Sequence, residues 1–173
     1  MAGESPGMGR GHWRVMGLLG LAVLGGCAVS PFAPSIVQDR GLRVAPAAVV
    51  TRPGSYVGRP VLWGGRILAS QNLSASTELT VLAYPLDSVG EPRLDRPALG
   101  RFVIREAGYL ETVDFAPNRL VSVYGGIAGV RSGQVGEKPY LYPVVQAQKL
   151  YLWPPGHPRP AVQFGIGIGI GVH

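Results

Sequence analysis

Apolar positions between residues 56 and 153 fall into short runs that are bounded by Gly, Pro, Asn, Asp or Ser. Such runs predict β-strands. In the second run Leu79, Val81 and Ala83 alternate with positions that are also fairly apolar, as expected for a strand of a closed barrel. The predicted strands cover residues 60–69, 77–85, 100–105, 119–130 and 140–153.

Two glycine pairs interrupt these runs, Gly64-Gly65 and Gly125-Gly126, and each predicts a bulge or a sharp bend. Pro143 predicts an edge or an irregular start for the fifth strand. Residues 106–118 have room for one short helix. The pattern predicts an all-β fold, a small OB-like five-stranded barrel over residues 56–153. A small β-sandwich has similar spacing and remains an alternative.

The first 26 residues have the three-part layout of a signal peptide. Arg10, His12 and Arg14 precede an apolar stretch at 15–24. That stretch is well short of the ~20 residues that a membrane-spanning helix needs. Two small residues then lead into a cysteine.

Leu24-Gly25-Gly26-Cys27 resembles the bacterial lipobox. A thiol is a strong nucleophile that can accept a lipid, so we expect cleavage between Gly26 and Cys27 and lipidation of Cys27. Several acyl chains such as palmitate would anchor the protein, whereas one chain binds membrane reversibly. Ala28 follows the cysteine, where an Asp would mark inner-membrane retention. The resemblance implies an outer membrane location, on the periplasmic face.

Two segments flank the predicted barrel. Residues 27–55 contain four prolines and no sustained period, which predicts a Pro-rich, partly extended tether, packed at most near its end. Residues 154–173 form a Pro-rich spacer and a Gly-Ile run. Docking of this tail on the body or on a partner, and disorder of the tail, are both open.

Composition narrows the fold and the partners. The 26 Gly and 16 Pro residues argue against long helices. A single cysteine excludes an intramolecular disulfide. The net charge is +6, but the basic residues are scattered arginines, so we expect no nucleic-acid partner.

Catalytic chemistry has little support in the sequence. The histidines are His12, His157 and His173, all outside the predicted barrel, and the acidic residues form no suggestive pair. We therefore predict no catalytic residue, no metal site, no cofactor and no enzymatic activity; a hydrolase is the least favoured class.

Aromatic residues lie on or near the predicted strands, where they fill a core or form a stacking surface for sugars. Core packing is the preferred interpretation. The residues are Trp63, Tyr84, Phe102, Tyr124, Tyr140, Tyr142, Tyr151 and Trp153.

A family resemblance rests on several short motifs between residues 59 and 153. Taken together, these motifs resemble the Slp family of outer-membrane lipoproteins, which implies a Gram-negative envelope protein linked to starvation or stationary phase. The resemblance brings no catalytic or ligand-binding residue. The motifs are Val61-Leu62-Trp63-Gly64-Gly65-Arg66-Ile67, Tyr84-Pro85-Leu86-Asp87, Gly100-Arg101-Phe102, Gly136-Glu137, Tyr142-Pro143-Val144-Val145 and Leu152-Trp153.

Two functions follow from these observations. The first is a non-enzymatic envelope component that is held to membrane by the lipid on Cys27 and contacts envelope proteins or glycans. The alternative is a periplasmic binding module whose barrel face holds an oligosaccharide or a small envelope molecule. Exposed aromatic rings converging with Arg66, Arg101 and Arg105 on a concave face would favour binding, whereas buried rings would favour the structural role.

Overall fold

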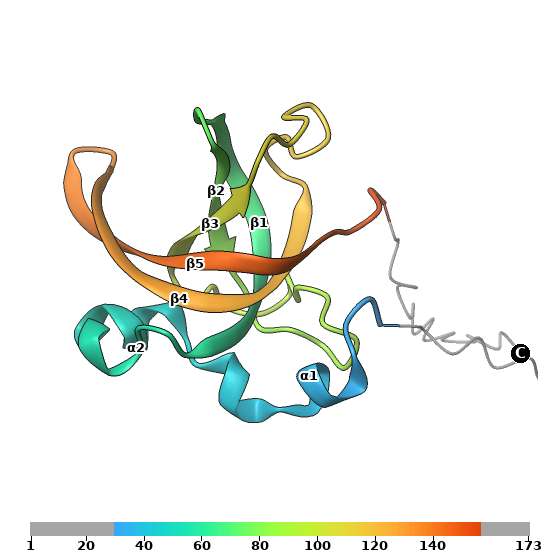
Figure 1. The fold of residues 1–173 in the computed structure, drawn as a ribbon. Coiled ribbons are helices and arrows are strands. Elements are labelled where there is room, and N and C mark those ends of the chain that lie inside the picture. The colour runs from blue at the N-terminus through green and yellow to red at the C-terminus, as the bar shows by residue number, and fades with distance from the viewer. Residues whose placement is uncertain (1–29, 157–173) are drawn as a thin grey trace, which may run out of the picture.

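The computed structural model describes residues 30–156. Five strands make up most of this part (Figure 1). Short helical turns precede them: α1 (Pro34–Gln38), η1 (Arg40–Arg43), α2 (Pro46–Thr51) and η2 (Pro53–Ser55). The strands are β1 (Pro60–Asn72), β2 (Ser76–Ala83), β3 (Arg101–Ala107), β4 (Leu120–Val135) and β5 (Lys138–Leu152).

The strands close into one barrel in the order β1-β2-β3-β5-β4. Neighbours pair antiparallel except β3 and β5, whose parallel pairing closes the ring. Closure leaves no open sheet edge around the ring. The structure thus confirms the predicted all-β, five-stranded barrel and excludes the β-sandwich.

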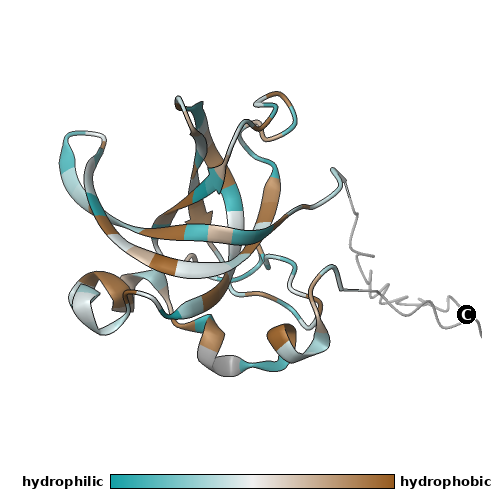
Figure 2. Ribbon diagram, viewed as in Figure 1, coloured by the Kyte–Doolittle hydropathy of each residue, from teal (hydrophilic) through white to brown (hydrophobic). Residues whose placement is uncertain are grey.

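Alternating side chains fill the barrel interior, and Figure 2 shows hydrophobic and hydrophilic bands alternating along the strands. Trp63 and Phe102 lie edge to face at the centre, with ring centroids 5.0 Å apart. Each large apolar side chain buried in this way contributes ~1.5–3 kcal/mol. The fully buried members include Val61, Ile67, Leu79, Val81, Phe102, Ile104, Val121 and Val123.

The glycine pairs lie where strands approach very closely. A Cβ on Gly65 would lie 1.9 Å from the carbonyl oxygen of Leu82, and one on Gly125 would lie 2.1 Å from that of Gln146. Only glycine fits at such distances. The pairing register shifts directly before Gly125, whereas in β1 it shifts between Ile67 and Ala69, after the glycine pair.

Pro143 lies within β5 rather than at an irregular start. It pairs with Val130 of β4, and the parallel pairing with β3 begins at the next residue, Val144. At Pro143 the strand therefore has a neighbour on one side only, so its missing N–H costs no bond to β3.

Residues 108–118 form turns, so the short helix expected in 106–118 is wrong. Backbone bonds from Asp114 and Phe115 to Glu111 make a single turn, and Asn118 then adopts a left-handed φ of 74°. Leu110 and Phe115 pack against the barrel core from this connection. The chain closes one end of the barrel without regular helix.

The segment before β1 packs on the barrel, so the tether interpretation is wrong for residues 30–55. Val49 of α2 is fully buried in the core. Phe32, Val37 and Leu42 pack with Leu62 in a second cluster on the outer side of β1. Prolines start both α1 and α2, positions where the missing N–H costs nothing.

Arg43 fastens this segment to the barrel. Its guanidinium donates to the carbonyl oxygens of Val37 at 2.6 Å, Leu86 at 3.2 Å and Asp87 at 3.3 Å. Beside it lies a mostly apolar cavity of about 150 Å³ lined by Val44, Trp63 and Leu99, among others. The cavity marks the seam between the N-terminal segment and the barrel.

Candidate functional site

The outer face of β2 and β3 and the adjoining part of β1 carry a group of charged side chains. Because Leu79, Val81 and Ala83 point inward, Glu78 and Leu82 point outward. Glu78 lies opposite Arg105, and Leu82 lies between Arg66 of β1 and Arg101 of β3. The three arginines named from the sequence thus share one face of the sheet.

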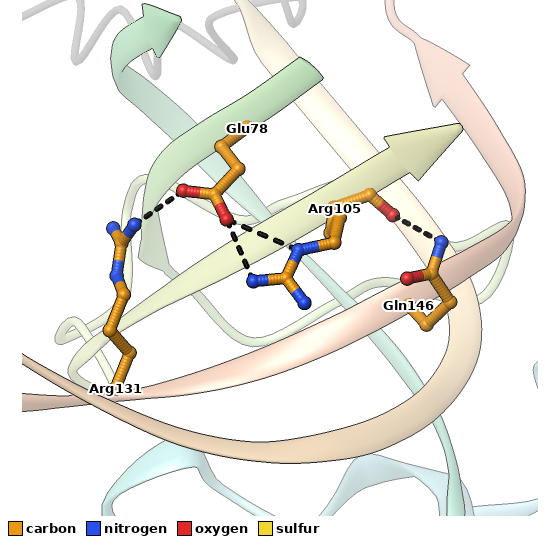
Figure 3. Close-up of polar contacts among 4 residues, drawn as sticks. All are labelled: Glu78, Arg105, Arg131 and Gln146. Carbon is orange, nitrogen blue, oxygen red and sulfur yellow. Dashed lines mark hydrogen bonds and ion pairs between the residues drawn. The ribbon is translucent and has the colours of Figure 1, made fainter. Parts of the chain in front are cut away.

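Glu78 joins two guanidinium groups in an arrangement that we call the Glu78 cluster (Figure 3). Nε and Nη2 of Arg105 donate to its Oε1 at 3.2 and 2.9 Å. Nη1 of Arg131 donates to its Oε2. The Glu78 side chain is only 6% exposed, whereas those of Arg105 and Arg131 are 40% and 45% exposed. The carboxylate is enclosed while both cations face solvent.

The curled β4–β5 hairpin brings Arg131 to this cluster. A small apolar cluster of Val103, Tyr142 and Val144 holds the hairpin against the outer face of β3. Tyr142 donates from its hydroxyl to the carbonyl of Gln134 at 2.8 Å, within the hairpin. Nε2 of Gln146 donates to the carbonyl of Arg105 at 3.0 Å.

A shallow hollow of about 280 Å³ lies between the two arginines. Gly129 lines it with a φ of 144°, next to a register shift of β4, and a Cβ on Gly129 would meet nothing within 4 Å. The lining residues are Arg105, Ala128, Gly129, Val130, Arg131 and Val144. Two arginines therefore border a space that a small anion can enter.

The aromatic residues named from the sequence are buried or half-buried. Trp63, Phe102, Tyr142 and Trp153 are all less than 9% exposed, and Nε1 of Trp153 donates to Oγ of Ser122 at 2.9 Å. The preferred interpretation, core packing, is confirmed for these four. The other aromatics of the set, Tyr84, Tyr124, Tyr140 and Tyr151, are half-buried.

Three of the described groups outside the cluster have shifted pKa values. A hydrogen bond to Asp95 raises the pKa of the partly exposed Arg93. Burial raises the pKa of Glu106, whose Oε2 has no hydrogen-bond partner in residues 30–156. A hydrogen bond to the carboxylate of Glu111 raises the pKa of the exposed Tyr109.

Several predicted positions lie outside the described residues: Gly26 and Cys27, the signal peptide, the three histidines and the tail from residue 157. Within residues 30–156 no group of three His, Cys, Asp or Glu side chains is placed to hold a metal ion. The helices of the same range are all too short or too polar to cross a membrane.

Glu78 and Arg131 were not singled out from the sequence. The available signal was Glu78 itself, an acidic residue in a strand whose neighbours on both faces are largely apolar. Such a carboxylate needs a charged partner once it is buried. The sequence does not show that Arg131 supplies one.

A profile of the outer membrane lipoprotein Slp family matches residues 24–165. The chain belongs to this family. Membership confirms the resemblance drawn from the short motifs and identifies an outer membrane, lipid-anchored protein.

Two lipoprotein or outer membrane protein sequences of Escherichia coli K12 are similar to this chain. An uncharacterized lipoprotein, YeaY, is 35% identical over 136 residues, which cover 76% of this chain and 67% of YeaY. The outer membrane protein Slp is 32% identical over 106 residues, 61% of this chain and 56% of Slp. The match thus spans little more than half of Slp.

Solved structures with a similar strand arrangement are distant. A small single-stranded DNA-binding protein from Streptomyces coelicolor gives a TM-score of 0.35 at 12% identity, over 55% of this chain and 94% of that chain. Schizosaccharomyces pombe Pot1pC bound to single-stranded DNA gives 0.32 at 8% identity, over 59% and 84%. Similarity at this level carries no inference about ligands.

Proposed function

We propose that this Slp-family protein is a non-enzymatic envelope component, anchored through lipid on Cys27 after cleavage between Gly26 and Cys27. The proposal rests on the short length of chain between Cys27 and the first residues that contact the barrel, Ser30 and Phe32. Oγ of Ser30 donates to the carbonyl of Val89 at 2.7 Å, and Phe32 is 2% exposed.

Ser30 lies three positions after Cys27 along the chain, a reach of at most about 11 Å. A lipid on Cys27 would therefore hold the barrel directly at the membrane surface. Ala28 after the cysteine, in place of an Asp, supports transport to the outer membrane, where the periplasmic face is the default location.

The charged groups that converge on the barrel support binding or structural roles rather than catalysis. Both oxygens of Glu78 accept hydrogen bonds from guanidinium groups, so neither is left free to take a proton from a substrate as a general base.

A role in starvation or stationary phase rests on the family resemblance. It predicts more protein per cell after growth stops, measured by immunoblot against a constitutive outer-membrane protein. Equal amounts in growing and resting cells would remove this part of the proposal.

Replacement of the proposed lipid acceptor tests the anchor. Cys27→Ser should leave uncleaved precursor or release the protein from the outer-membrane fraction, because serine offers no thiol for acylation. The matched control is Ser30→Ala, which leaves Cys27 intact and should fractionate as wild type. Normal processing and membrane fractionation of Cys27→Ser would refute the proposal.

A second function, a periplasmic binding module, is favoured by one observation. Arg66, Arg101, Arg105 and Arg131 gather on one face, although they are scattered in the sequence. Burial of the aromatic rings makes sugar stacking a less favoured mode of binding, because Trp63, Phe102 and Tyr142 offer no open surface to a sugar.

A further inference from the structure

We infer that the hollow between Arg105 and Arg131 is a binding site for the phosphate group of a ligand that approaches from the periplasm. This inference deepens the second proposed function. The phosphate site itself does not depend on lipidation of Cys27, whereas the side from which its ligand approaches rests on that anchor. Two guanidinium groups share one carboxylate, which leaves the cluster one positive charge in excess.

Glu78 fixes the two cations in place but does not use all of their donors. Arg105 donates from Nε and Nη2 to Oε1 of Glu78, and Arg131 donates from Nη1 to Oε2. A guanidinium has five N–H donors in a planar fork. Donors remain on both groups, and both side chains are more than one third exposed.

The surroundings add space, and two further arginines lie along the same face. Arg66 and Arg101 flank Leu82, four residues along β2 from Glu78. Gly129 has no side chain to fill the hollow of about 280 Å³. A phosphate group, with three acceptor oxygens and up to two negative charges, can bridge two guanidinium groups.

The position of the site indicates where its ligand comes from. The β4–β5 hairpin, whose residues 128–131 and 144 line the hollow, curls away from the side of the barrel where the described chain begins (Figure 1). With Cys27 three residues before Ser30, the anchoring bilayer lies on the Ser30 side. A phosphate-bearing solute or glycan reaches the hairpin side more readily than a headgroup of that bilayer.

Phosphate titration of the full mature chain in neutral detergent tests the site. With ¹⁵N-labelled arginine, the Nε–H signals of Arg105 and Arg131 should shift saturably with inorganic phosphate, and not with chloride at equal ionic strength. Arg131→Gln should weaken binding roughly tenfold or more, because it removes a charged hydrogen-bonding group. Arg131→Lys, which keeps the charge and loses the fork, should be intermediate.

Arg93→Gln is the matched control. Arg93 is a partly exposed arginine of the β2–β3 connection, paired with Asp95 at 2.8 Å, and its loss changes the net charge equally. It should leave phosphate binding and the melting temperature unchanged, whereas Arg131→Gln, which removes one of the two partners of buried Glu78, should lower the melting temperature but still unfold cooperatively. Equal weakening by the two variants, or shifts that chloride reproduces, would overturn the site.

Lipid nanodiscs separate the two sources of phosphate. Discs of phosphatidylcholine with phosphatidylglycerol should not compete with inorganic phosphate for the two arginine signals. Competition by these discs would overturn the periplasmic source, since a lipid headgroup would then occupy the hollow. Neither result bears on the anchoring proposal, which Cys27→Ser tests separately.

Discussion

Glu106 places a carboxylate in a half-buried position of the barrel, where its charge is poorly solvated. It follows the inward-facing Phe102 and Ile104 on β3 with the same two-residue period, so it points toward the end closed by Leu110 and Phe115. Its Oε2 is buried without a partner among the described groups, and burial raises its pKa. The fold therefore favours the protonated form.

Glu106→Gln should stabilise the protein at pH 7 by a few tenths of a kcal/mol, because a neutral amide replaces a half-buried carboxylate that solvent screens only in part. With a raised folded-state pKa, the folded protein binds more protons than the unfolded chain. Stability conferred by Glu106 is therefore greatest at low pH and falls as pH rises through the unfolded and folded pKa values.

Urea unfolding from pH 3 to pH 7 measures this difference. The gain from Glu106→Gln should shrink toward zero at the acidic end, where the wild-type carboxyl is neutral as well. Glu137→Gln, at the exposed tip of the β4–β5 hairpin, should change stability little at any pH. A gain independent of pH would contradict the electrostatic explanation.

Among the elements, α2 has the least expected role. It is only six residues long, yet Val49 is fully buried in the main core and α2 contacts β3 and β5. A helix this short is unstable alone, so packing on the barrel must hold it. It closes the barrel from the segment before β1, whereas the connection from β3 to β4 closes the opposite end without a helix.

Val49→Ala should destabilise the whole barrel by about 2 kcal/mol, because it removes fully buried methyl groups from the core. Val57→Ala is the matched control, since Val57 lies in the same part of the chain and is 54% exposed. The measurement is the urea midpoint of each variant. A loss confined to residues 30–55, seen as faster amide exchange there with an unchanged midpoint, would show that α2 is peripheral.

The whole molecule is arranged around a short link to the lipid. Ser30 is bonded to Val89 within three residues of Cys27, and the curled tip of the β4–β5 hairpin lies on the other side of the barrel (Figure 1). Cys27 is the single cysteine and would carry lipid. One engineered cysteine can therefore report distance from the membrane.

A fluorophore at Ser88→Cys should be quenched by nickel-chelating lipids more strongly than one at Glu137→Cys. Ser88 is exposed next to Val89, whereas Glu137 is exposed at the hairpin tip. The measurement is quenching in proteoliposomes of the lipidated chain. Insertion of ten Gly/Ser residues before Ser30 should reduce the difference; equal quenching without the insertion would contradict an orientation fixed by the short link.

The sequence by itself predicted features that depend on local pattern. Apolar positions recur along each strand in short runs, so the five strands and the all-β class could be predicted from the sequence. Buried or half-buried rings also followed from their strand positions. The family emerged from short motifs such as those around Trp63 and Tyr142, because their order along the chain does not depend on the fold.

Tertiary structure decided what depends on distant partners. Residues 30–55 read as a tether because their apolar residues follow no period, yet Val49 and Phe32 are buried by surfaces formed only when the barrel closes. Glu78 meets Arg105 and Arg131 because strand register and hairpin curl bring together residues 27 and 53 positions apart. Pairing between distant residues leaves no local pattern, so only the fold reveals the arginine-lined face.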